Sequence, residues 1–419
     1  MESKIMAILN PLSHAFGVDI GDRSFKLTQL IRRHNGYQLL AWGSIDVPEG
    51  VLDRGEIIDQ EKAAALLAEL VKSARGRLRG RAVVACLPEA KTFVKIIEIA
   101  KETTDDGLRR AVLTEIEQNI PLPQDEIYYD WQVLPDIRPK KPAERAATSA
   151  AAAEEKKDEE SETAAKGEPG ADEKPAAEPG AEEEAGPEPS TPSRPMTRVL
   201  LGAAPKSLVD SYTSMLEKAG LAPIALEIEA MAISRAIVPH DTAPEEAVGL
   251  LDIGATRSSL VIFDGGSVQM SISIPISGIE ITRTVSSLLN VSMEDAEVLK
   301  RECGLDADRC EDKMWKILLP LIDDMTAKIR NALRFYRIGF PQGKKIEKLY
   351  LCGGGALFKE IDTVLSRKLT IKVRRGNPLI NLTKKMPKAF RDEQPLTYAT
   401  AIGLGLDATD ENRQYRRSF

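Results

Sequence analysis

The chain contains the same short sequence pattern twice. Residues 17–21 read Gly-Val-Asp-Ile-Gly and lead into a strand-like run at 24–27, and residues 250–254 read Leu-Leu-Asp-Ile-Gly and lead into another at 258–261. In each copy an apolar run ends near an aspartate, and a glycine lets the backbone turn tightly. One Asp-x-Gly turn is common in hairpins that bind nothing. Two copies in matching frames predict two similar lobes with a ligand at their interface, and 419 residues exceed the usual limit of one core.

The chemistry of the two turns points to phosphate and magnesium. Backbone amides of a glycine-containing turn can hold phosphate oxygens, and an adjacent carboxylate can hold the waters of a magnesium ion. We therefore expect Asp19 and Asp252 to hold magnesium-bound waters, and we expect the ligand to be magnesium–ATP.

A third glycine-containing element lies near the end of the chain. Residues 348–352 predict a buried strand, which Gly353, Gly354 and Gly355 follow directly, before a helix that ends near Leu369. Glycines between a strand and a helix N-terminus let a flat group or a phosphate approach the backbone. A plain flexible loop is the alternative interpretation.

Together these segments resemble the actin, sugar-kinase and chaperone-ATPase superfamily and, within it, the PilM family of type IV pilus assembly ATPases. The resemblance covers nearly the whole chain outside one insertion. It rests on residues 16–21 with Lys26, 251–254, 351–357 and, more specifically for the family, 198–206, 226–230 and 296–300. It implies an α/β protein with a two-lobed actin-like (ribonuclease H-like duplicated) ATPase fold and a small inserted α/β subdomain.

The resemblance also implies a set of nucleotide-binding residues. Lys26 is expected to reach the terminal phosphates, and Glu297 with Lys300 to face the ribose and adenine. Glu227 resembles the residue that positions the attacking water, and the neighbouring Glu229 competes for that role. The full cofactor-binding set comprises Asp19, Gly21, Asp22, Arg23, Ser24, Lys26, Asp252, Gly254, Thr256, Glu297, Lys300, Gly353, Gly354 and Gly355.

Two residues of the first phosphate loop depart from the family pattern. Asp22 and Arg23 stand where small hydroxyl residues are usual. Asp22 would bring a negative charge near the phosphates, and we expect Arg23 to offset it. The sequence therefore predicts ATP binding with at most slow ATPase activity, and it leaves hydrolysis open.

A long polar segment divides the chain. Residues 136–197 contain sixteen acidic and nine basic residues, and the resulting charge of −7 equals the net charge of the whole chain. Such a composition cannot bury enough apolar surface to order itself. The remainder is formally neutral, which argues against a nucleic-acid partner. The strands expected on either side, 127–134 and 198–203, predict that this tether is the tip of a hairpin; an interdomain linker is the alternative.

The remaining sequence alternates expected strands and helices, with helices at 61–73, 105–118 and 229–237. This pattern divides the chain into lobes and insertions. The predicted units are 14–48 for the first part of lobe one, 49–135 and 198–222 for the inserted subdomain, 136–197 for the tether, 223–245 for the return of lobe one, 246–407 for lobe two and 408–419 for a polar tail.

The four cysteines predict a reducing compartment. Cys86 and Cys352 lie in strand-like runs, and Cys303 and Cys310 lack the spacing and nearby histidines of a metal site. We expect no signal peptide and no membrane span, because the opening residues have no long apolar core and no run of about 18 apolar residues occurs. The protein is therefore expected to be cytoplasmic.

The expected partner follows from the resemblance. PilM-like proteins hold the N-terminal peptide of the inner-membrane protein PilN, so we expect a role in pilus biogenesis and twitching motility, with recruitment to the inner-membrane platform through PilN. The groove is expected between lobe one and the subdomain built from about 49 to 205, walled by 105–118 and 127–134. Self-association stays open. An FtsA-like cell-division ATPase and a type II secretion platform component are the alternatives, although FtsA normally ends in an amphipathic membrane helix and residues 410–419 are polar.

Overall fold

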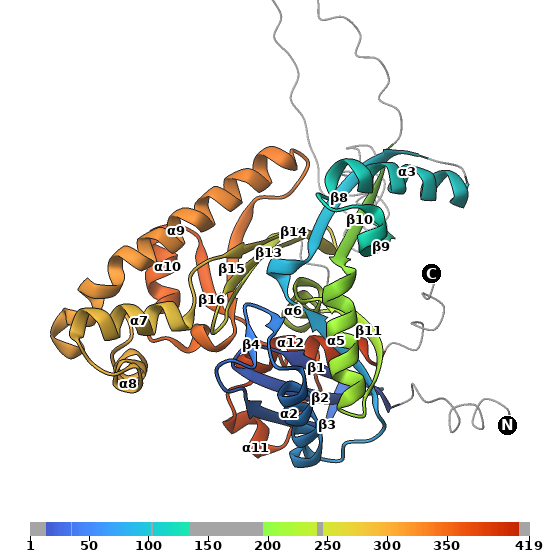
Figure 1. Cartoon of the computed structure of the whole chain (residues 1–419). Coiled ribbons are helices and arrows are strands. Elements are labelled where there is room, and N and C mark those ends of the chain that lie inside the picture. The colour runs from blue at the N-terminus through green and yellow to red at the C-terminus, as the bar shows by residue number, and fades with distance from the viewer. Residues whose placement is uncertain (1–13, 35, 102–103, 135–195, 241–245, 410–419) are drawn as a thin grey trace, which may run out of the picture.

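Two sheets with the same strand order form the two lobes of the protein (Figure 1). The computed structural model describes residues 14–34, 36–101, 104–134, 196–240 and 246–409. The first sheet has the order β11 (Ala222–Ile228), β7 (Ala82–Leu87), β1 (Phe16–Ile20), β2 (Ser24–Arg33), β3 (Gly36–Asp46) and β6 (Arg75–Gly76). The second has the order β14 (Ser267–Ile274), β13 (Ser258–Asp264), β12 (Ala247–Ile253), β15 (Ile346–Cys352) and β16 (Lys372–Arg375).

Each sheet is built by the same path of the chain. Three consecutive strands run antiparallel, β1-β2-β3 in one lobe and β12-β13-β14 in the other. Two later strands then add parallel on the other side of the first strand, β7 and β11 in lobe one and β15 and β16 in lobe two. This repeated topology is the duplicated actin-like fold that the sequence predicted, and that prediction is confirmed.

Two helices lie between the lobes. Helix α12 (Ala399–Asp407) packs on β1 and β2, and α6 (Glu229–Ile237) packs on α12 and on β12, β13 and β14. Every residue of α12 is buried. Glycines allow the backbones to come this close. A Cβ on Gly403 of α12 would lie 1.8 Å from the Ala232 carbonyl oxygen of α6, and a Cβ on Gly17 of β1 would lie 2.3 Å from the Gly405 nitrogen of α12.

The outer faces of the sheets are covered by other helices. In lobe one, α2 (Gln60–Ser73) and α5 (Lys206–Lys218) pack over an apolar core that includes Phe16, Leu67 and Tyr212. In lobe two the covering helices are α7 (Gly278–Leu289), α8 (Met293–Cys303), the long α9 (Lys313–Gly339) and α10 (Ile361–Leu369). The short α11 (Lys388–Asp392) and the two-residue strands β4 (Leu52–Asp53) and β5 (Glu56–Ile57) complete the set. None of the helices in these described ranges is long and apolar enough to cross a membrane.

A separate three-stranded antiparallel sheet forms the small subdomain. Its order is β8 (Phe93–Ala100), β10 (Met196–Pro205) and β9 (Ile127–Val133), with α3 (Asp105–Asn119) packed against it. Because β9 pairs with β10, from Ile127 opposite Pro205 to Val133 opposite Val199, the strands that flank the tether are neighbours, as predicted. The tether itself lies outside the described residues.

The small sheet occupies a narrower stretch than the 49–135 and 198–222 expected for the inserted subdomain. Strand β7 pairs with β1, and α2 and α5 pack on the core of the first sheet. These segments are held by lobe one because their apolar faces meet its strands. The expected division of the rest of the chain stays a prediction.

The structure corrects the expectation that all four cysteines are reduced. Cys303, buried at the end of α8, forms a disulfide with Cys310, seven residues later, with a Cα–Cα distance of 5.8 Å. Cys86 and Cys352 are free and buried, as expected from their strands. The sequence pattern missed the disulfide because a turn, and not a short Cys-x-x-Cys spacing, brings the two sulfur atoms together.

The close packing of α6 against α12 gives a stability prediction. We expect Gly403→Ala to lower the free energy of unfolding by about 3 kcal/mol, because the new methyl group would overlap backbone that has no flexible end to move. Gly339→Ala is the control, since its methyl group would meet nothing within 4 Å. Chemical denaturation of both variants measures the difference, and equal loss of stability in the two would contradict this packing argument.

Candidate functional site

The two repeated hairpins have the same local geometry. In the first, the Gly21 amide donates to the Ser24 carbonyl oxygen at 3.2 Å, and in the second the Gly254 amide donates to the Arg257 carbonyl oxygen at 2.9 Å. The strand registers also agree, because Asp19 lies opposite Lys26 and Asp252 lies opposite Ser259. The duplication seen in the sequence is therefore a duplication of the turn and of the register around it.

The third glycine loop lies against the second hairpin. Gly353 has a φ of +77°, and a Cβ there would lie 2.1 Å from Oδ1 of Asp252. A Cβ on Gly355 would lie 2.1 Å from Cγ2 of Ile253, whereas one on Gly354 would meet nothing within 4 Å. Only glycine lets this loop sit on the end of β12, and the middle residue faces open space. The expected convergence of this loop with Asp252 is thus present.

Buried carboxylates from three elements influence one another electrostatically in this region. Burial raises the pKa of Asp19, an effect that the opposite Lys26 partly offsets. Burial and then the charge of Asp19 raise the pKa of Asp252 to about 6. Burial, opposed by the charge of Arg257 and reinforced by Asp252 and Asp19, raises the pKa of Glu229, the first residue of α6, to about 8. Like charges are therefore held together out of water, an arrangement that favours a cation.

The cluster fits a magnesium ion held through its waters. No group of three or more His, Cys, Asp or Glu residues in the described part of the chain is arranged to hold a metal directly. Magnesium keeps several waters and is typically bound by one or two carboxylates plus substrate phosphates. Asp19 and Asp252 match that requirement, and Lys26 supplies a cation beside them, with Nζ 2.5 Å from the Ser24 hydroxyl oxygen.

Asp22 is offset by a residue other than the expected one. Its Oδ2 lies 3.8 Å from Nη1 of Arg257 and accepts a hydrogen bond from the Thr256 hydroxyl, and its Oδ1 accepts the Gly55 amide at 2.8 Å. Arg23, which the sequence favoured for this role, instead forms an ion pair at 3.0 Å with the exposed Glu49. The correction has a simple cause, since Asp22 faces the opposite hairpin while its neighbour Arg23 turns to the surface.

Glu227 is paired with Arg235. Its carboxylate accepts hydrogen bonds from both terminal nitrogens of Arg235, at 2.9 and 3.1 Å. Glu229, which the sequence left as the competitor, is the residue coupled electrostatically to Asp19 and Asp252. Although the two residues are only two positions apart, Glu227 belongs to strand β11 and Glu229 to helix α6, so their side chains have different surroundings.

Glu297 and Lys300 form an ion pair on α8, with 2.5 Å between Nζ and Oε2. Lys300 also donates to the Thr282 hydroxyl at 2.9 Å and to the Gly278 carbonyl oxygen at 3.2 Å. Ser292 caps the N-terminus of this helix, because its hydroxyl accepts the Asp295 amide at 3.0 Å. These contacts tie α8 to the start of α7; the ribose and adenine role of the pair stays a prediction.

The sequence analysis missed Arg257 and gave Glu229 a secondary place. Each residue has a visible but unspecific feature in the sequence. Arg257 is the cation of the second hairpin, and Glu229 is an acidic first residue of a helix. A first-turn carboxylate is common for capping reasons alone, and the position of Arg257 matches Ser24 and not Lys26. Sequence comparison of the two hairpins therefore gave no reason to single it out.

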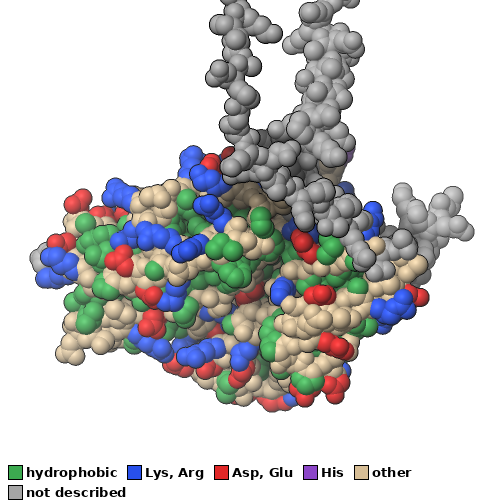
Figure 2. Space-filling model, turned by 90° about the horizontal axis from the view of Figure 1, so that it is seen from above, with side chains coloured by type: hydrophobic (Ala, Val, Ile, Leu, Met, Phe, Trp, Pro, Cys, Tyr) green, Lys and Arg blue, Asp and Glu red, His purple; other side chains and the backbone are tan. Residues whose placement is uncertain are grey.

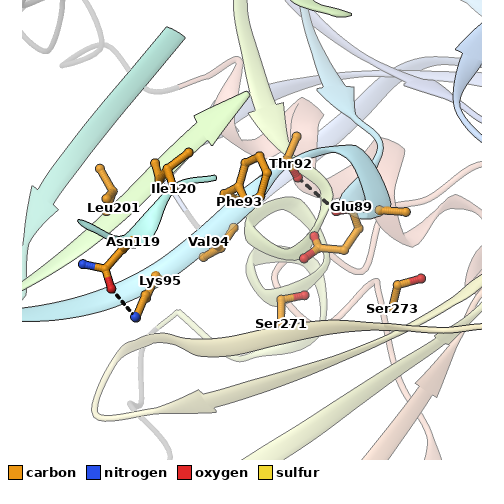
Figure 3. Close-up of a pocket in the computed structure, with 11 residues that line it drawn as sticks. Glu89, Thr92, Phe93, Val94, Lys95, Asn119, Ile120, Leu201, Ser271 and Ser273 are labelled. Atoms are coloured by element: carbon orange, nitrogen blue, oxygen red, sulfur yellow. Dashed lines mark hydrogen bonds between the residues drawn. The ribbon is translucent and has the colours of Figure 1, made fainter. Parts of the chain in front are cut away.

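Two cavities lie beside the small subdomain and outside the hairpins. One, of about 350 Å³, opens between β8 and β14, where the Glu89 carboxylate lies near Ser271 and Lys95 contacts Asn119 (Figure 3). Burial raises the pKa of Glu89. The other, of about 410 Å³, is lined by residues 127–131 of β9, by Arg109 of α3 and by Lys206 of α5. The second cavity lies where α3 and β9 were expected to wall a groove.

The surface carries no single basic stripe on the face that Figure 2 shows. Acidic and basic side chains are interspersed there with hydrophobic ones, outside the area covered by grey atoms. This distribution agrees with the neutral charge expected for the folded part.

Comparison with protein families gives one match over most of the chain. The sequence model described as type IV pilus assembly protein PilM matches residues 17–170 and 183–409. Among solved structures, a PilM–PilN type IV pilus biogenesis complex has a similar fold, with a TM-score of 0.71 and 23% sequence identity over 95% of this chain and 99% of that chain.

Curated relatives cover less of the chain. The cell division protein FtsA of Neisseria meningitidis serogroup B is 23% identical over 227 residues, which span 50% of this chain and 53% of that protein. FtsA of Bacillus subtilis is 27% identical over 99 residues, 24% of this chain and 22% of that protein. The chain thus spans about half the length of the first of these relatives and about a fifth of the second.

The raised pKa of Glu229 predicts how stability depends on pH. The folded protein holds this proton up to about pH 8, whereas the unfolded chain loses it near the ordinary glutamate pKa of 4.5. The unfolded state therefore binds fewer protons between these limits, and the free energy of unfolding should fall as the pH rises from 5 to 8, by on the order of a few kcal/mol.

Glu229→Gln should flatten this dependence, because the amide resembles the protonated acid. Glu69→Gln, on the exposed face of α2, is the control and should keep the slope of the unmodified protein. Denaturant unfolding at several pH values in the absence of nucleotide and magnesium tests this. A Glu229→Gln protein with an unchanged slope would show that the carboxyl is not buried in its acidic form.

Proposed function

The chain belongs to the family described as type IV pilus assembly protein PilM, and we propose that it is the ATP-binding component of the pilus inner-membrane assembly platform that holds the N-terminus of PilN. Two parts of the structure support this proposal. One is the pair of hairpins around the acidic cluster, and the other is the groove beside the small sheet.

The meeting of Asp19 and Asp252 across the two lobes carries the nucleotide part of the proposal. In it, these carboxylates hold the waters of magnesium, and Lys26 binds the terminal phosphates. The Gly353–Gly355 loop leaves space beside Gly354 for the adenosine. The bound magnesium supplies charge stabilisation of the phosphates, which is the chemistry this cluster lacks by itself.

Slow turnover follows from the state of Glu229. In the proposal, Glu229 replaces Glu227 as the residue that orients water, because Glu227 is engaged by Arg235. A general base must be deprotonated to accept a proton. With a pKa of about 8 before ligand binds, Glu229 is mostly protonated at neutral pH and must lose this proton before it can act as a base, which suits a protein that works mainly as a nucleotide-dependent switch between lobe arrangements.

The partner site is the cavity lined by β9, α3 and the start of α5. Strand β9 is an edge strand of the small sheet, and Tyr128 and Val133 on it are each 48% exposed. Tyr129 and Trp131 stack on each other, and Lys206 lies 5.5 Å from the centre of the Tyr128 ring. An extended peptide can add to such an edge and seat apolar side chains beside the aromatic rings.

The proposal places the protein in the cytoplasm, held at the inner membrane through PilN. An FtsA-like role in cell division is the second candidate, since FtsA proteins match part of the chain. The two candidates differ in their partner, so peptide binding separates them.

The nucleotide part predicts the effect of two substitutions. Lys26→Ala and Asp252→Ala should each weaken magnesium–ATP binding about tenfold to a hundredfold, because each removes a contact involving a charge worth about 1.5–3 kcal/mol. Glu227→Ala should spare binding. Isothermal titration calorimetry measures the affinity of each variant for magnesium–ATP. Identical affinity in the unmodified protein, Lys26→Ala and Asp252→Ala would rule out this site.

The partner part predicts binding of a synthetic PilN N-terminal peptide with an affinity in about the micromolar range, as for short segments that order on binding. Trp131→Ala should weaken it, because the ring lines the cavity. Ile338→Ala, 68% exposed on α9 in lobe two, is the matched control and should bind normally. Fluorescence anisotropy with and without ATP measures the affinities. A folded protein that binds no peptide in either state would favour the FtsA-like candidate.

A further inference from the structure

Arg257 lies among the acidic groups of the site, at a position where the first hairpin has Ser24. The equivalence comes from the backbone, since both residues accept the amide of the glycine that starts the turn. The charge of Arg257 lowers the pKa values of Asp19, Asp252 and Glu229 against the effect of burial. Together with Lys26, Arg257 therefore offsets the negative charge of this cluster.

The guanidinium of Arg257 is incompletely satisfied. Its side chain is 18% exposed, and its Nη1 is buried with no hydrogen-bond acceptor. Asp22 is near, but at 3.8 Å it is beyond hydrogen-bond distance. The same carboxylate already accepts hydrogen bonds from Gly55 and Thr256. A buried charged donor without an acceptor is unfavourable, and a group that brings acceptors to it gains affinity.

We propose that Arg257 is a phosphate-binding residue that Asp22 restrains in the nucleotide-free protein and that exchanges Asp22 for a nucleotide phosphate on binding. This inference rests on the proposed nucleotide function. A guanidinium presents its N–H groups in a planar fork that suits phosphate oxygens, which a lysine cannot reproduce.

The exchange reaches the small subdomain through a short series of contacts. Nη1 of Arg257 lies against Gly55, where a Cβ would be 3.1 Å away, and Asp22 accepts the Gly55 amide. The Gly55 carbonyl oxygen accepts the Tyr212 hydroxyl at 2.9 Å. Tyr212 is on α5, which directly follows strand β10 of the small sheet. When Arg257 turns to phosphate, Asp22 loses its neighbouring cation and Gly55 loses the guanidinium that lies against it.

A double-mutant cycle tests this exchange. Magnesium–ATP affinity is measured by calorimetry for the unmodified protein, Arg257→Ala, Asp22→Asn and the double variant. Arg257→Ala should weaken binding about tenfold to a hundredfold, and Asp22→Asn should strengthen it severalfold. Because Asp22 acts through Arg257, Asp22→Asn should have no effect in the Arg257→Ala background. An undiminished effect there would mean that Asp22 repels phosphate directly, and the exchange would be refuted.

Controls separate a phosphate contact from a structural role. Arg374→Ala and Asp53→Asn remove the same groups from exposed positions on β16 and β4 and should leave affinity unchanged. Adenosine monophosphate should bind Arg257→Ala as it binds the unmodified protein if Arg257 contacts only the outer phosphates, whereas equal losses for both nucleotides would point to misfolding and overturn the assignment. Hydrogen exchange at the Gly55 amide should speed up when ATP binds the unmodified protein and stay unchanged in Arg257→Ala.

The outcomes distinguish the inference from the function beneath it. If the unmodified protein binds no magnesium–ATP, the proposed nucleotide function fails. If it binds and Arg257→Ala binds equally well, only the inference fails, and Lys26 alone serves the phosphates.

Discussion

The structure depends on holding acidic side chains of two lobes together at the ends of equivalent strands. Asp19 and Asp252 occupy the same register positions in two sheets of the same topology, so any arrangement that brings the hairpins face to face also brings their charges together. Burial makes this repulsion costly, and it is expressed as raised pKa values for both aspartates and for Glu229. Lys26 and Arg257 limit that cost, and a magnesium–nucleotide complex would remove more of it. In the proposed function, nucleotide binding would therefore be coupled electrostatically to the approach of the two hairpins.

The helices between the lobes are packed too tightly to slide past each other. Helix α6 carries Glu229 at its first position and packs through Ala232 on Gly403 of α12. Helix α12 in turn lies on β1, the strand that carries Asp19 and ends one residue before Gly21. Backbone contacts this close leave little room for sliding, so a change at the acidic cluster moves whole elements. The small sheet is connected to lobe one through α5, which directly follows β10. In the proposed function, this connection would transmit binding at the hairpins to the groove beside β9.

Much of the fold could be predicted from the sequence, because its signals are local. Periodicity placed α2, α3 and α6 within a few residues, and the repeated Asp-x-Gly turn predicted two matching lobes. Helix α12 was not identified, since Ala-Ile-Gly-Leu-Gly-Leu has no polar face and its glycines discourage a helix in isolation. Only contact with α6 and β1 makes it one. The prediction that Arg23 offsets Asp22 was wrong for a similar reason. Arg23 is adjacent in sequence, whereas Arg257 comes from the opposite lobe. The disulfide between Cys303 and Cys310 likewise depends on a turn that spacing alone does not specify.

The central claim is that buried carboxylates receive a metal–nucleotide complex. Calorimetry of magnesium–ATP binding at pH 6, repeated in buffers with different enthalpies of ionisation, measures the protons released. Asp252, with a pKa of about 6, is about half protonated there, and it must lose its proton to hold the metal's waters. The account predicts proton release that requires magnesium and is smaller in Asp252→Asn. Binding that releases no protons, or that is equally tight when magnesium is chelated, would contradict it.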